Sequence, residues 1–554
     1  MDAIATTPTP ANEPVGSFAP GTPERERLRA ELARLAATPT EVHHVIGGRH
    51  RRKAGPVIEV VQPHRHAAVL GTLTFAEPRD VQDAIEAATA AAPGWRALSF
   101  EDRAAVFLRA ADLLAGPWRE TLAAATMLGQ SKTAYQAEID TPCELVDFWR
   151  FNVHFARQIL AEQPISTPGV WNRLDYRPLE GFVYAITPFN FTAIAGNLPT
   201  APALMGNTVL WKPAPTQAVA AYWTMKLLEA AGLPPGVINL VHGAGPEVSE
   251  VALADARLAG VHFTGSTATF RHLWRTVATN LDGYHGYPRL VGETGGKDFV
   301  LAHSSADPDA LTTALIRGAF DYQGQKCSAA SRAFVPASVW AKMGADFVDQ
   351  VGALTYGDVT DFGHFGGALI DRRAFDKNAE AIARAKATTG LTIAAGGRTD
   401  DSVGYFVEPT VLLGDDPTDE AFRTEYFGPI LSVHVYDDAR PGSFDAAMEL
   451  VDKGAAYGLT GSIVADDRAA VAAATDRLRF AAGNFYVNDK PTGAVVGQQP
   501  FGGGRASGTN DKAGSPQNLL RWTSARTIKE TFVPPTDHRY PHQAPMPGTG
   551  TEVR

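Results

Sequence analysis

The stretch that decides the fold is "GFVYAITPFNFTAIAGNLPTAPALMGNTVLWKPAP", residues 181–215. It contains an apolar strand pattern, a turn rich in Pro and Asn, a helical pattern and a second apolar strand. Another helical pattern follows over 217–232, and strand patterns come at 236–243 and 259–265. Strands that alternate with helices predict parallel βαβ units. Such sheets bind ligands at the carboxyl ends of their strands, so we expect a site at turns such as "TPFNFT" and "FTGST".

A second alternating series runs from about Phe299 to Asn488 and includes the strand patterns "DFVLAH" and "ILSVHVY". The junction between the two series falls in "RLVGETGGKDFV", residues 289–300. A Gly-rich loop follows Asn488, and "RWTSARTIKETFV" (521–533) then has the pattern of a strand. Because this strand lies beyond both series in the sequence, we expect it to pair with another subunit.

The N-terminal part of the chain is predicted to be mainly helical. Residues 24–37 form a short helix, 56–61 and 67–75 are β-rich, and helical patterns fill much of 78–163. The first residues and the last twenty are rich in Pro and Thr. This composition is typical of a flexible leader and a flexible tail.

Composition excludes several classes of protein. The chain has 554 residues, two cysteines and a formal charge of −10, with acidic and basic residues mixed along its length. Two cysteines do not make a disulfide scaffold, which favours a reducing compartment. We expect no nucleic-acid or membrane partner and no metal site, since no apolar run spans a bilayer and the histidines are scattered. No secretory or Arg-rich transit pattern begins the sequence, so the expected location is cytoplasmic.

The segment "GQKCSAASR" (324–332) holds the candidate nucleophile, Cys327. A cysteine thiolate adds to an aldehyde, and hydride loss from the adduct leaves a thioester that water cleaves. Small neighbours leave room for a substrate, and Lys326 favours the thiolate if it points inward. The alternative is an inert buried thiol, which is also the interpretation of Cys143.

Two further residues complete the set that covalent oxidation of a carbonyl group requires. Glu293, at the end of an apolar strand in "VGETGGKD", is the candidate base that activates water. Asn190 in "TPFNFT" is the candidate donor to the oxyanion, together with the backbone N–H of Cys327. The alternatives are a surface glutamate in a turn and an asparagine that caps the next helix.

Two glycine-containing turns, "HGAGPE" and "FTGST", are candidate phosphate-binding loops. Each is a weak signal, and "HGAGPE" lacks the final glycine of the dinucleotide fingerprint. Ordinary strand–helix turns explain them about as well.

Seven stretches in one order resemble the aldehyde dehydrogenase superfamily: "TPFNFT", "GNTVLWKPA", "FTGST", "ETGGKD", "GQKCSAASR", "EYFGPI" and "PFGG". The resemblance covers roughly residues 40–530. It implies an α/β fold with a Rossmann-type cofactor domain, an α/β catalytic domain and a small β oligomerisation extension. It also implies that Cys327 is the nucleophile, Glu293 the deacylating base and Asn190 the oxyanion donor.

With these domains in mind, the expected boundaries are the following. The flexible leader and short helix cover residues 1–40, and the NAD-binding domain, with N-terminal helices and part of the oligomerisation region, covers 41–297. The catalytic domain covers 298–488. An anchor loop, the return to the cofactor domain and the oligomerisation strand make up 489–534, and the flexible tail is 535–554.

The resemblance further implies a set of cofactor-binding residues. Lys212 is expected at the adenosine ribose, Ser266 at the pyrophosphate and Glu425 at the nicotinamide ribose, with Trp211 lining the site. The remaining residues of this set are Thr187, Pro188, Phe189, Gly245, Gly265 and Phe427. The family prefers NAD. Many NAD-preferring members carry a glutamate after the "KP" of this strand, whereas here Pro215 follows and strict exclusion of NADP is not implied.

Within the superfamily, the chain is most similar to the 1-pyrroline-5-carboxylate dehydrogenases, as "VGQQPFGGGRASGTNDKAG" illustrates. This implies NAD-dependent oxidation of L-glutamate γ-semialdehyde to L-glutamate, the second step of proline degradation. The implied substrate-binding residues are Phe191, Ser328, Gly493, Ala494, Phe501 and Glu144. Relatives often have serine where Ala494 stands, so one hydroxyl donor to the substrate carboxylate is lost.

Three alternatives remain open at this point: another semialdehyde dehydrogenase, a cysteine-dependent hydrolase without a dinucleotide, and a catalytically silent protein on the same scaffold. The expected partners are a small-molecule substrate, further copies of this chain in a dimer or larger homo-oligomer, and a separate proline dehydrogenase, because the leader is too short to hold a second catalytic domain.

Overall fold

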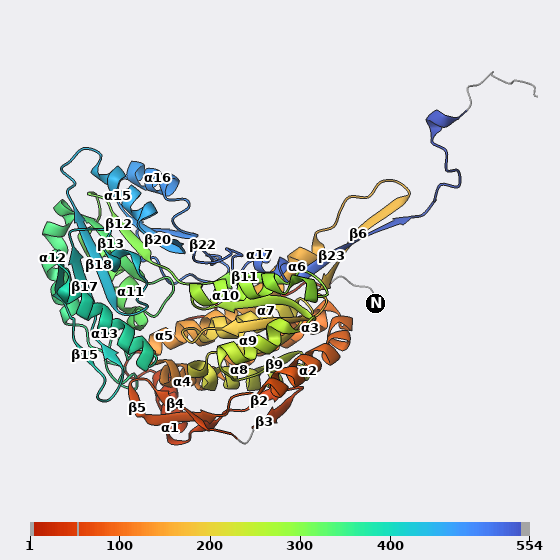
Figure 1. Ribbon diagram of the computed structural model, residues 1–554, viewed down its shortest axis with the longest axis horizontal. Coiled ribbons are helices and arrows are strands. Elements are labelled where there is room, and N and C mark those ends of the chain that lie inside the picture. Colours follow the sequence, from red (N-terminus) through yellow and green to blue (C-terminus); the bar gives the residue numbers. More distant parts are fainter. Residues whose placement is uncertain (1–4, 53–54, 545–554) are drawn as a thin grey trace, which may run out of the picture.

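The computed structural model describes residues 5–52 and 55–544 as two α/β bodies that lie side by side (Figure 1). The sheet of the first body consists, in spatial order, of β11 (Arg289–Glu293), β10 (Leu258–Thr264), β7 (Phe182–Thr187), β8 (Thr208–Pro213), β9 (Ile238–Leu240), β2 (His44–Ile46) and β3 (Arg49–Arg51). The first five are parallel, and β2 and β3 are antiparallel to their neighbours.

The sheet of the second body consists of β14 (Leu391–Ala395), β17 (Thr410–Gly414), β18 (Ile430–Tyr436), β13 (Ala330–Pro336), β12 (Asp298–Ala302), β20 (Thr460–Val464) and β21 (Asn484–Val487). All of its neighbouring strands are parallel except the pair of β14 and β17. The predicted pair of parallel α/β sheets is therefore confirmed, with the first ending at residue 293 and the second beginning at 298.

Helices cover the sheets and fill the N-terminal part. Those of the first body are α1 (Pro23–Ala37), α2 (Pro78–Ala97), α3 (Phe100–Ala115), α4 (Arg119–Gln130), α5 (Ala134–Glu138), a π-helical turn (Ile139–Glu144), α6 (Leu145–Ala161), α7 (Thr192–Leu204), α8 (Ala218–Ala230), α9 (Gly245–Ala254), α10 (Thr267–Thr279) and α17 (Pro516–Leu520). Those of the second body are α11 (Pro308–Phe320), α12 (Ala337–Gly352), α13 (Arg372–Ala387), α14 (Glu420–Arg423), α15 (Ser443–Lys453) and α16 (Arg468–Arg477). None of the helices within the described ranges is long and apolar enough to cross a bilayer.

Short strands form the remaining sheets. They are β1 (Thr40–Glu41), β5 (Arg65–Leu73) and β4 (Ile58–Gln62) in one sheet, and the pairs β15 (Thr399–Asp400) with β16 (Phe406–Val407), β19 (Tyr457–Gly458) with β22 (Gly504–Arg505), and β6 (Val170–Pro178) with β23 (Thr523–Thr531). The last pair is a two-stranded antiparallel ribbon that projects from the first body (Figure 1). The predicted strand at 521–533 is thus present, and its partner in this structure is β6 of the same chain.

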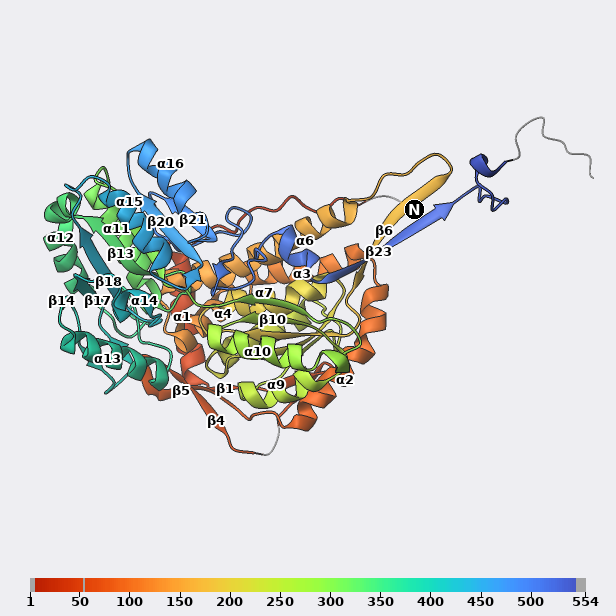
Figure 2. The same cartoon turned by 45° about the horizontal axis from the view of Figure 1, so that its top comes forward.

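The leader differs from the flexible segment expected from its composition. Residues 5–22 have no regular secondary structure before α1, but they lie along α6 (Figure 2) and are held there by hydrogen bonds and by the buried ring of Phe18. Composition predicted the absence of helix and strand correctly. It did not reveal the contacts, because they are made to residues more than a hundred positions away. Residues 1–4 and 545–554 lie outside the described residues, and so do the corresponding parts of the expected leader and tail.

A buried ion pair positions the helix that begins beside the "TPFNFT" turn. Lys132 Nζ lies 2.6 Å from Asp140 Oδ2, and both side chains are buried. Asp140 also accepts hydrogen bonds from the backbone N–H groups of Thr192 (3.0 Å) and Ala193 (2.9 Å), the first two residues of α7. A carboxylate at this place satisfies donors that have no partner within the helix and interacts favourably with its dipole.

We expect Asp140→Ala to lower the free energy of unfolding by about 3–5 kcal/mol, because it leaves the Lys132 ammonium buried without a partner and removes the cap of α7. Lys132→Met should cost less, since Asp140 keeps two backbone donors. Urea denaturation followed by tryptophan fluorescence measures both. The control is Lys453→Met, which breaks the exposed pair with Glu449 and should cost under about 1 kcal/mol. Equal costs for Asp140→Ala and Lys453→Met would contradict this account.

Candidate active site

The site lies where the ends of the two sheets face each other. β7, β8, β10 and β11 end at Thr187, Pro213, Thr264 and Glu293, and the candidate residues of the first body follow or occupy these carboxyl ends. The order of the strands reverses at β7, with β8 on one side and β10 on the other, which is where such sheets bind ligands. From the second body, Cys327 and Glu425 precede β13 and β18, at the amino ends of these strands. The expectation that carboxyl ends form the site therefore describes only the first body.

The turn that carries Cys327 has an unusual backbone. Tyr322, Gln323 and Gly324 are three consecutive residues with positive φ, of 49°, 52° and 64°. The two that are not glycine are each strained by about 1–3 kcal/mol and persist only where the surroundings fix them. The side-chain amide of Gln323 supplies one such restraint, donating to the carbonyl oxygens of Ser131 (2.9 Å) and Ala368 (2.8 Å). This turn therefore holds the sulfur in place from both bodies.

Cys327 itself is half-buried, whereas Cys143 is buried. Burial raises the pKa of the Cys327 thiol well above its usual value, and the nearby carboxyls of Asp298, Glu293 and Glu425 raise it further. The sulfur therefore interacts electrostatically with both predicted carboxylates, and formation of a thiolate requires compensating donors or positive charge. The condition set for Lys326, that it point toward the sulfur, is not met, since its ammonium lies 3.8 Å from Asp321. Burial raises the pKa of Cys143 to about 12, in agreement with the prediction of an inert thiol.

Asn190 is buried and its side chain faces the turn of Cys327. Its Nδ2 donates to the backbone carbonyl of Gln325 at 3.0 Å. An amide nitrogen carries two hydrogens, so this bond orients the group and leaves a second donor for an oxyanion. The alternative of a helix cap is excluded, because Asp140 caps α7.

Glu293 ends β11 and is partly buried. Burial raises the pKa of its carboxyl well above the usual value, and Lys512 and a hydrogen bond from the backbone of Gly503 partly oppose this. Its Oε2 is buried without a hydrogen-bond partner among the described residues. A desolvated carboxyl with one unoccupied oxygen has the basicity and the open position that a general base needs.

Several residues of the predicted cofactor set fit a dinucleotide. Lys212 on β8 is buried, burial lowers its pKa to about 8, and no hydrogen bond or ion pair joins it to another described residue. Gly245, where α9 begins, lies close to this ammonium, since a Cβ atom built on it would be 3.9 Å from Lys212 Nζ. The N-terminus of α10 is at Ser266, whose Oγ accepts a hydrogen bond from Thr269 N at 3.1 Å. A lone ammonium and two helix N-termini suit the phosphates and hydroxyls of such a cofactor.

The other predicted cofactor residues lie around this set. Glu425 Oε1 accepts a hydrogen bond from Gly296 N at 2.8 Å, which ties it to the segment after Glu293. Thr187 accepts one from the indole of Trp211 at 3.0 Å. The rings of Phe189 and Phe427 meet edge to face, with their centroids 5.8 Å apart. Pro188 is buried next to Phe189, and Gly265 follows β10 with partial exposure.

The predicted substrate residues fall into two groups. Ser328 is buried and its hydroxyl lies 2.8 Å from that of Thr492, directly before Gly493 and Ala494. Phe501 pairs through its backbone with Ala513. On the other side, Lys132 Nζ lies 4.1 Å from the ring centroid of Phe191. Burial and the nearby Asp140 carboxyl raise the pKa of Glu144 well above its usual value.

Sequence reasoning missed four residues that shape the site: Lys132, Asp140, Thr492 and Lys512. Lys132 and Asp140 connect α7 to Phe191, Thr492 holds Ser328, and Lys512 acts on the charge of Glu293. Thr492 and Lys512 stand in the Gly-rich loop after Asn488, so the composition of this loop could have indicated that it contributes to the site. Lys132 and Asp140 carry no local signal, because a charged residue in a helical region normally lies on the solvated face. No group of three or more His, Cys, Asp or Glu in the described part of the chain is arranged to hold a metal ion.

Comparison with known proteins agrees with this geometry. The model of the family described as "Aldehyde dehydrogenase family" matches residues 50–528. A delta-1-pyrroline-5-carboxylate dehydrogenase of Bos taurus is 48% identical over 533 residues, 96% of this chain and 94% of that protein. The corresponding protein of Homo sapiens is 47% identical over 531 residues, again 96% and 94%.

A crystal structure of the Mycobacterium tuberculosis delta-pyrroline-5-carboxylate dehydrogenase bound with NAD is 70% identical. It superposes with a TM-score of 0.95 and covers 98% of this chain and 100% of that one. The resemblance and the fold expected from the sequence are thereby confirmed.

One expectation is wrong by the same comparison. The relatives from Bos taurus and Homo sapiens are named as mitochondrial proteins, which contradicts the cytoplasmic location. The expectation depended on the lack of a recognisable targeting pattern, and a missing pattern does not define a compartment.

A family model that spans most of the sequence and relatives that align over nearly the whole chain lead to one assignment: this chain belongs to the aldehyde dehydrogenase family.

Proposed function

We propose that this chain oxidises L-glutamate γ-semialdehyde, the open form of 1-pyrroline-5-carboxylate, to L-glutamate with NAD, as the second step of proline degradation. The observation that carries the proposal is the bond from Asn190 to Gln325 in the turn of Cys327, together with the electrostatic interaction of Cys327 with Glu293 and the contact of Ser328 with Thr492, directly before Gly493. The names of the relatives that align over nearly the whole chain support the same reaction.

Catalysis begins with the thiolate of Cys327, which forms a bond to the aldehyde carbon. The second N–H of Asn190 and the backbone N–H of Cys327 stabilise the negative charge on the former carbonyl oxygen. Collapse of this adduct expels a hydride and leaves a thioester on the sulfur. NAD⁺, when bound, supplies the acceptor for that hydride. Lys212, Ser266 and Glu425 are the residues that hold the cofactor, in the roles that the family resemblance implies.

Hydrolysis of the thioester depends on Glu293. Its unoccupied Oε2 accepts a proton from water, and the resulting hydroxide attacks the thioester carbon. The carbon–sulfur bond breaks, L-glutamate leaves as the γ-carboxylate, and the thiol is restored. The raised pKa of Glu293 makes it a stronger base than an exposed glutamate.

Recognition of the substrate requires donors for its α-carboxylate and a place for its α-ammonium. Gly493 has a φ of 91°, which lets the turn at 493–494 present backbone N–H groups, and Ser328 adds a hydroxyl. Phe191 and Phe501 contact the aliphatic carbons between the two ends of the substrate. Glu144 faces the ammonium.

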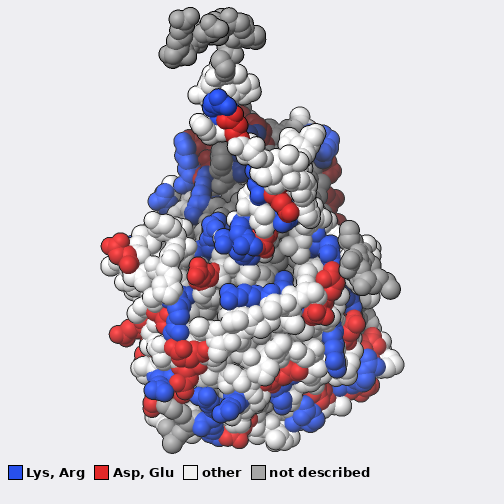
Figure 3. Space-filling model, turned by 90° about the vertical axis from the view of Figure 1, so that its right-hand side faces the viewer, with Lys and Arg blue, Asp and Glu red and all other residues white. Residues whose placement is uncertain are grey.

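The ribbon of β6 and β23 supports the proposal of a homo-oligomer, a dimer or larger. It projects from the body (Figure 1), and Figure 3 shows this side of the molecule, on which charged side chains of both signs are exposed. Large apolar side chains on this ribbon are exposed to solvent: 51% of Trp171 on β6, and 61% of Phe532 and 80% of Val533 after β23. Such exposure is unfavourable unless another copy of the chain covers these side chains. We also propose that a separate proline dehydrogenase supplies the substrate. For the domains, we propose the boundaries predicted from the sequence, except that the leader is packed against the first body and is not flexible.

The purified protein should reduce NAD⁺ with 1-pyrroline-5-carboxylate at least tenfold more efficiently, in kcat/KM, than with succinate semialdehyde or propanal. The reason is that only the first carries the α-carboxylate that the turn at 493–494 binds. Absorbance at the NADH band measures all three rates. A preference for succinate semialdehyde would assign the chain to the other semialdehyde dehydrogenase, and ester hydrolysis without any NADH would favour the hydrolase.

Cys327→Ala should abolish NADH formation, because no other group in the site forms the covalent adduct, and it should leave the affinity for NAD⁺ within about threefold of wild type. The matched control is Cys143→Ala, which removes the other, buried thiol and should retain activity. Isothermal titration with NAD⁺ and a steady-state assay provide the two readouts. Turnover by Cys327→Ala near the wild-type rate would refute the assignment.

The rate of deacylation should rise as the pH increases through the raised pKa of Glu293, because only the ionised carboxylate accepts a proton from water. Glu293→Gln should lower kcat by about 10²–10⁴-fold and remove this acidic limb from the pH profile. Glu180→Gln, at an exposed turn, serves as the control and should keep the wild-type kcat and the acidic limb of the pH profile. An acidic limb that persists unchanged in Glu293→Gln would exclude this carboxyl as the base.

A further inference from the structure

The leader reaches the loop that the proposed function assigns to the substrate carboxylate. We define the anchor loop as residues 493–499. It begins at Gly493, and its last residues turn back on themselves, with Gln498 N and Gln499 N both donating to Val495 O at 3.0 and 2.9 Å. The leader passes along α6 toward this loop (Figure 2). Residues from the two ends of the sequence therefore meet at the substrate site.

Asn12 makes the contacts between the leader and the anchor loop. Its Nδ2 donates to the carbonyl oxygen of Val496 at 2.8 Å and to Asp147 Oδ2 at 2.7 Å. Its Oδ1 accepts from Gln498 Nε2 at 2.9 Å. The next residue, Glu13, donates its backbone N–H to the other oxygen of Asp147 at 2.7 Å. One side-chain amide thus uses both of its hydrogens and its oxygen to join the anchor loop to α6.

These contacts connect two parts of the substrate site. Asp147 lies in the first turn of α6, three residues after the N-cap Glu144, so its position is fixed relative to the residue proposed to face the substrate ammonium. Val496 lies three residues after Gly493, where the carboxylate binds. Asn12 thus bridges the helix that follows Glu144 and the loop that follows Gly493.

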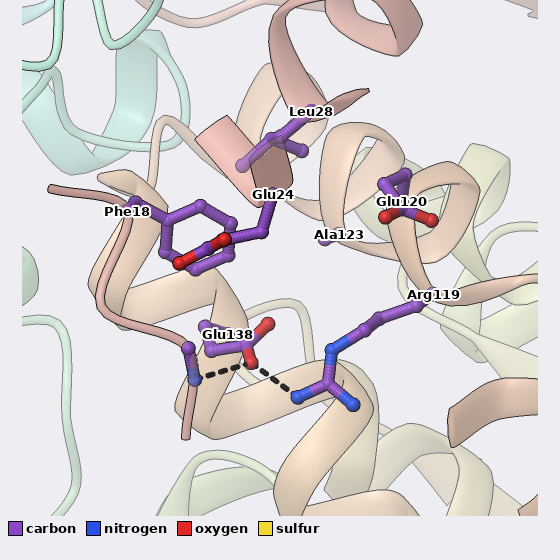
Figure 4. A pocket seen from close by; sticks show the side chains of 8 residues that line it. Phe18, Glu24, Leu28, Arg119, Glu120, Ala123 and Glu138 are labelled. Carbon is purple, nitrogen blue, oxygen red and sulfur yellow. Dashed lines mark hydrogen bonds and ion pairs between the residues drawn. The ribbon is translucent and has the colours of Figure 1, made fainter. Parts of the chain in front are cut away.

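The leader has its own attachment, independent of Asn12. Glu13 forms ion pairs with Arg119 (2.7 Å) and Arg150 (2.8 Å), and Gly16 N donates to Glu138 at 2.8 Å. Figure 4 shows the ring of Phe18 and the Glu138–Arg119 pair around a small cavity of about 30 Å³ under the leader. Because these contacts hold the leader in place, a substitution at Asn12 removes its hydrogen bonds to the anchor loop without detaching the leader.

We propose that Asn12 is a positioning residue that determines the affinity for substrates bearing an α-carboxylate. It acts through the anchor loop and does not touch the reacting atoms. This inference depends on the proposed function, since it assumes that the turn at 493–494 binds the carboxylate. Its role differs from that of the residues around Cys327, because it concerns the far end of the substrate.

The test compares two substrates in the full-length protein. Asn12→Ala should raise KM for 1-pyrroline-5-carboxylate about tenfold, the loss that corresponds to one hydrogen bond to a charged group, and leave its kcat within twofold. KM for propanal, which has no carboxylate, and KM for NAD⁺ should stay unchanged. Asn12→Asp should have a larger effect, because it also places a second carboxylate beside Asp147. The control is Ser17→Ala in the same leader, at an exposed side chain that does not contact the loop.

Equal changes of KM for both substrates, or none, in Asn12→Ala would overturn the inference, as would an effect of Ser17→Ala as large as that of Asn12→Ala. Thermal unfolding of each variant shows whether a general loss of structure has occurred. If the wild-type protein itself oxidises propanal but not 1-pyrroline-5-carboxylate, the proposed function fails and this inference with it. A selective rise in KM for the carboxylate-bearing substrate supports both.

Discussion

The buried pair of Lys132 and Asp140 is the interaction on which the rest of the site depends. Asp140 binds the first two amides of α7 and so fixes the end of the turn that holds Asn190 and Phe191. Lys132 contacts the ring of Phe191 and, 4.5 Å from its centroid, that of Tyr322, the first residue of the strained turn before Cys327. Asn190, Phe191 and the turn before Cys327, to which the proposed function gives the oxyanion donor, a substrate contact and the nucleophile, therefore share one electrostatic support. Removing one partner is costly because the other remains charged in a region that water does not reach.

The two sheets contribute to the site in different ways. The first presents carboxyl ends and helix N-termini, which suit an anionic cofactor, and the second presents amino ends, where Cys327 and Glu425 stand on connecting turns. Burial raises the pKa of the Cys327 thiol, the carboxyls near the sulfur raise it further, and both effects favour the thiol over the thiolate. This coupling limits the reactivity of the thiol toward other electrophiles, because the thiolate forms only when its surroundings compensate the charge.

Much of this could be predicted from the sequence. Alternating apolar runs predicted both sheets, and the motifs around Asn190, Glu293 and Cys327 predicted which turns meet, because residues at strand ends inherit their positions from the sheet. The contacts of Asn12, Asp140 and Lys132 could not be predicted in the same way. They join segments that are remote in the sequence, and their side chains have no local pattern that separates a structural ion pair from a solvated charge. The ordered leader was missed for the same reason, since its composition is that of a flexible segment while its stability comes from the surface that it covers.

The distance in sequence between Asn12 and the anchor loop has a consequence for biosynthesis. Asn12 is separated from its partners Val496 and Gln498 by 484 and 486 positions. Likewise, β6 pairs with β23, which lies near the opposite end of the chain. On a ribosome that adds about 5–20 residues per second, the first dozen residues emerge roughly half a minute or more before the loop that they bind. The first body itself is completed only by α17 and the buried Trp522, so its core and its projecting ribbon form fully only after almost the entire polypeptide has been made. A truncated translation product therefore lacks the contacts between Asn12 and the loop at 493–499, and it lacks the strand that completes the ribbon.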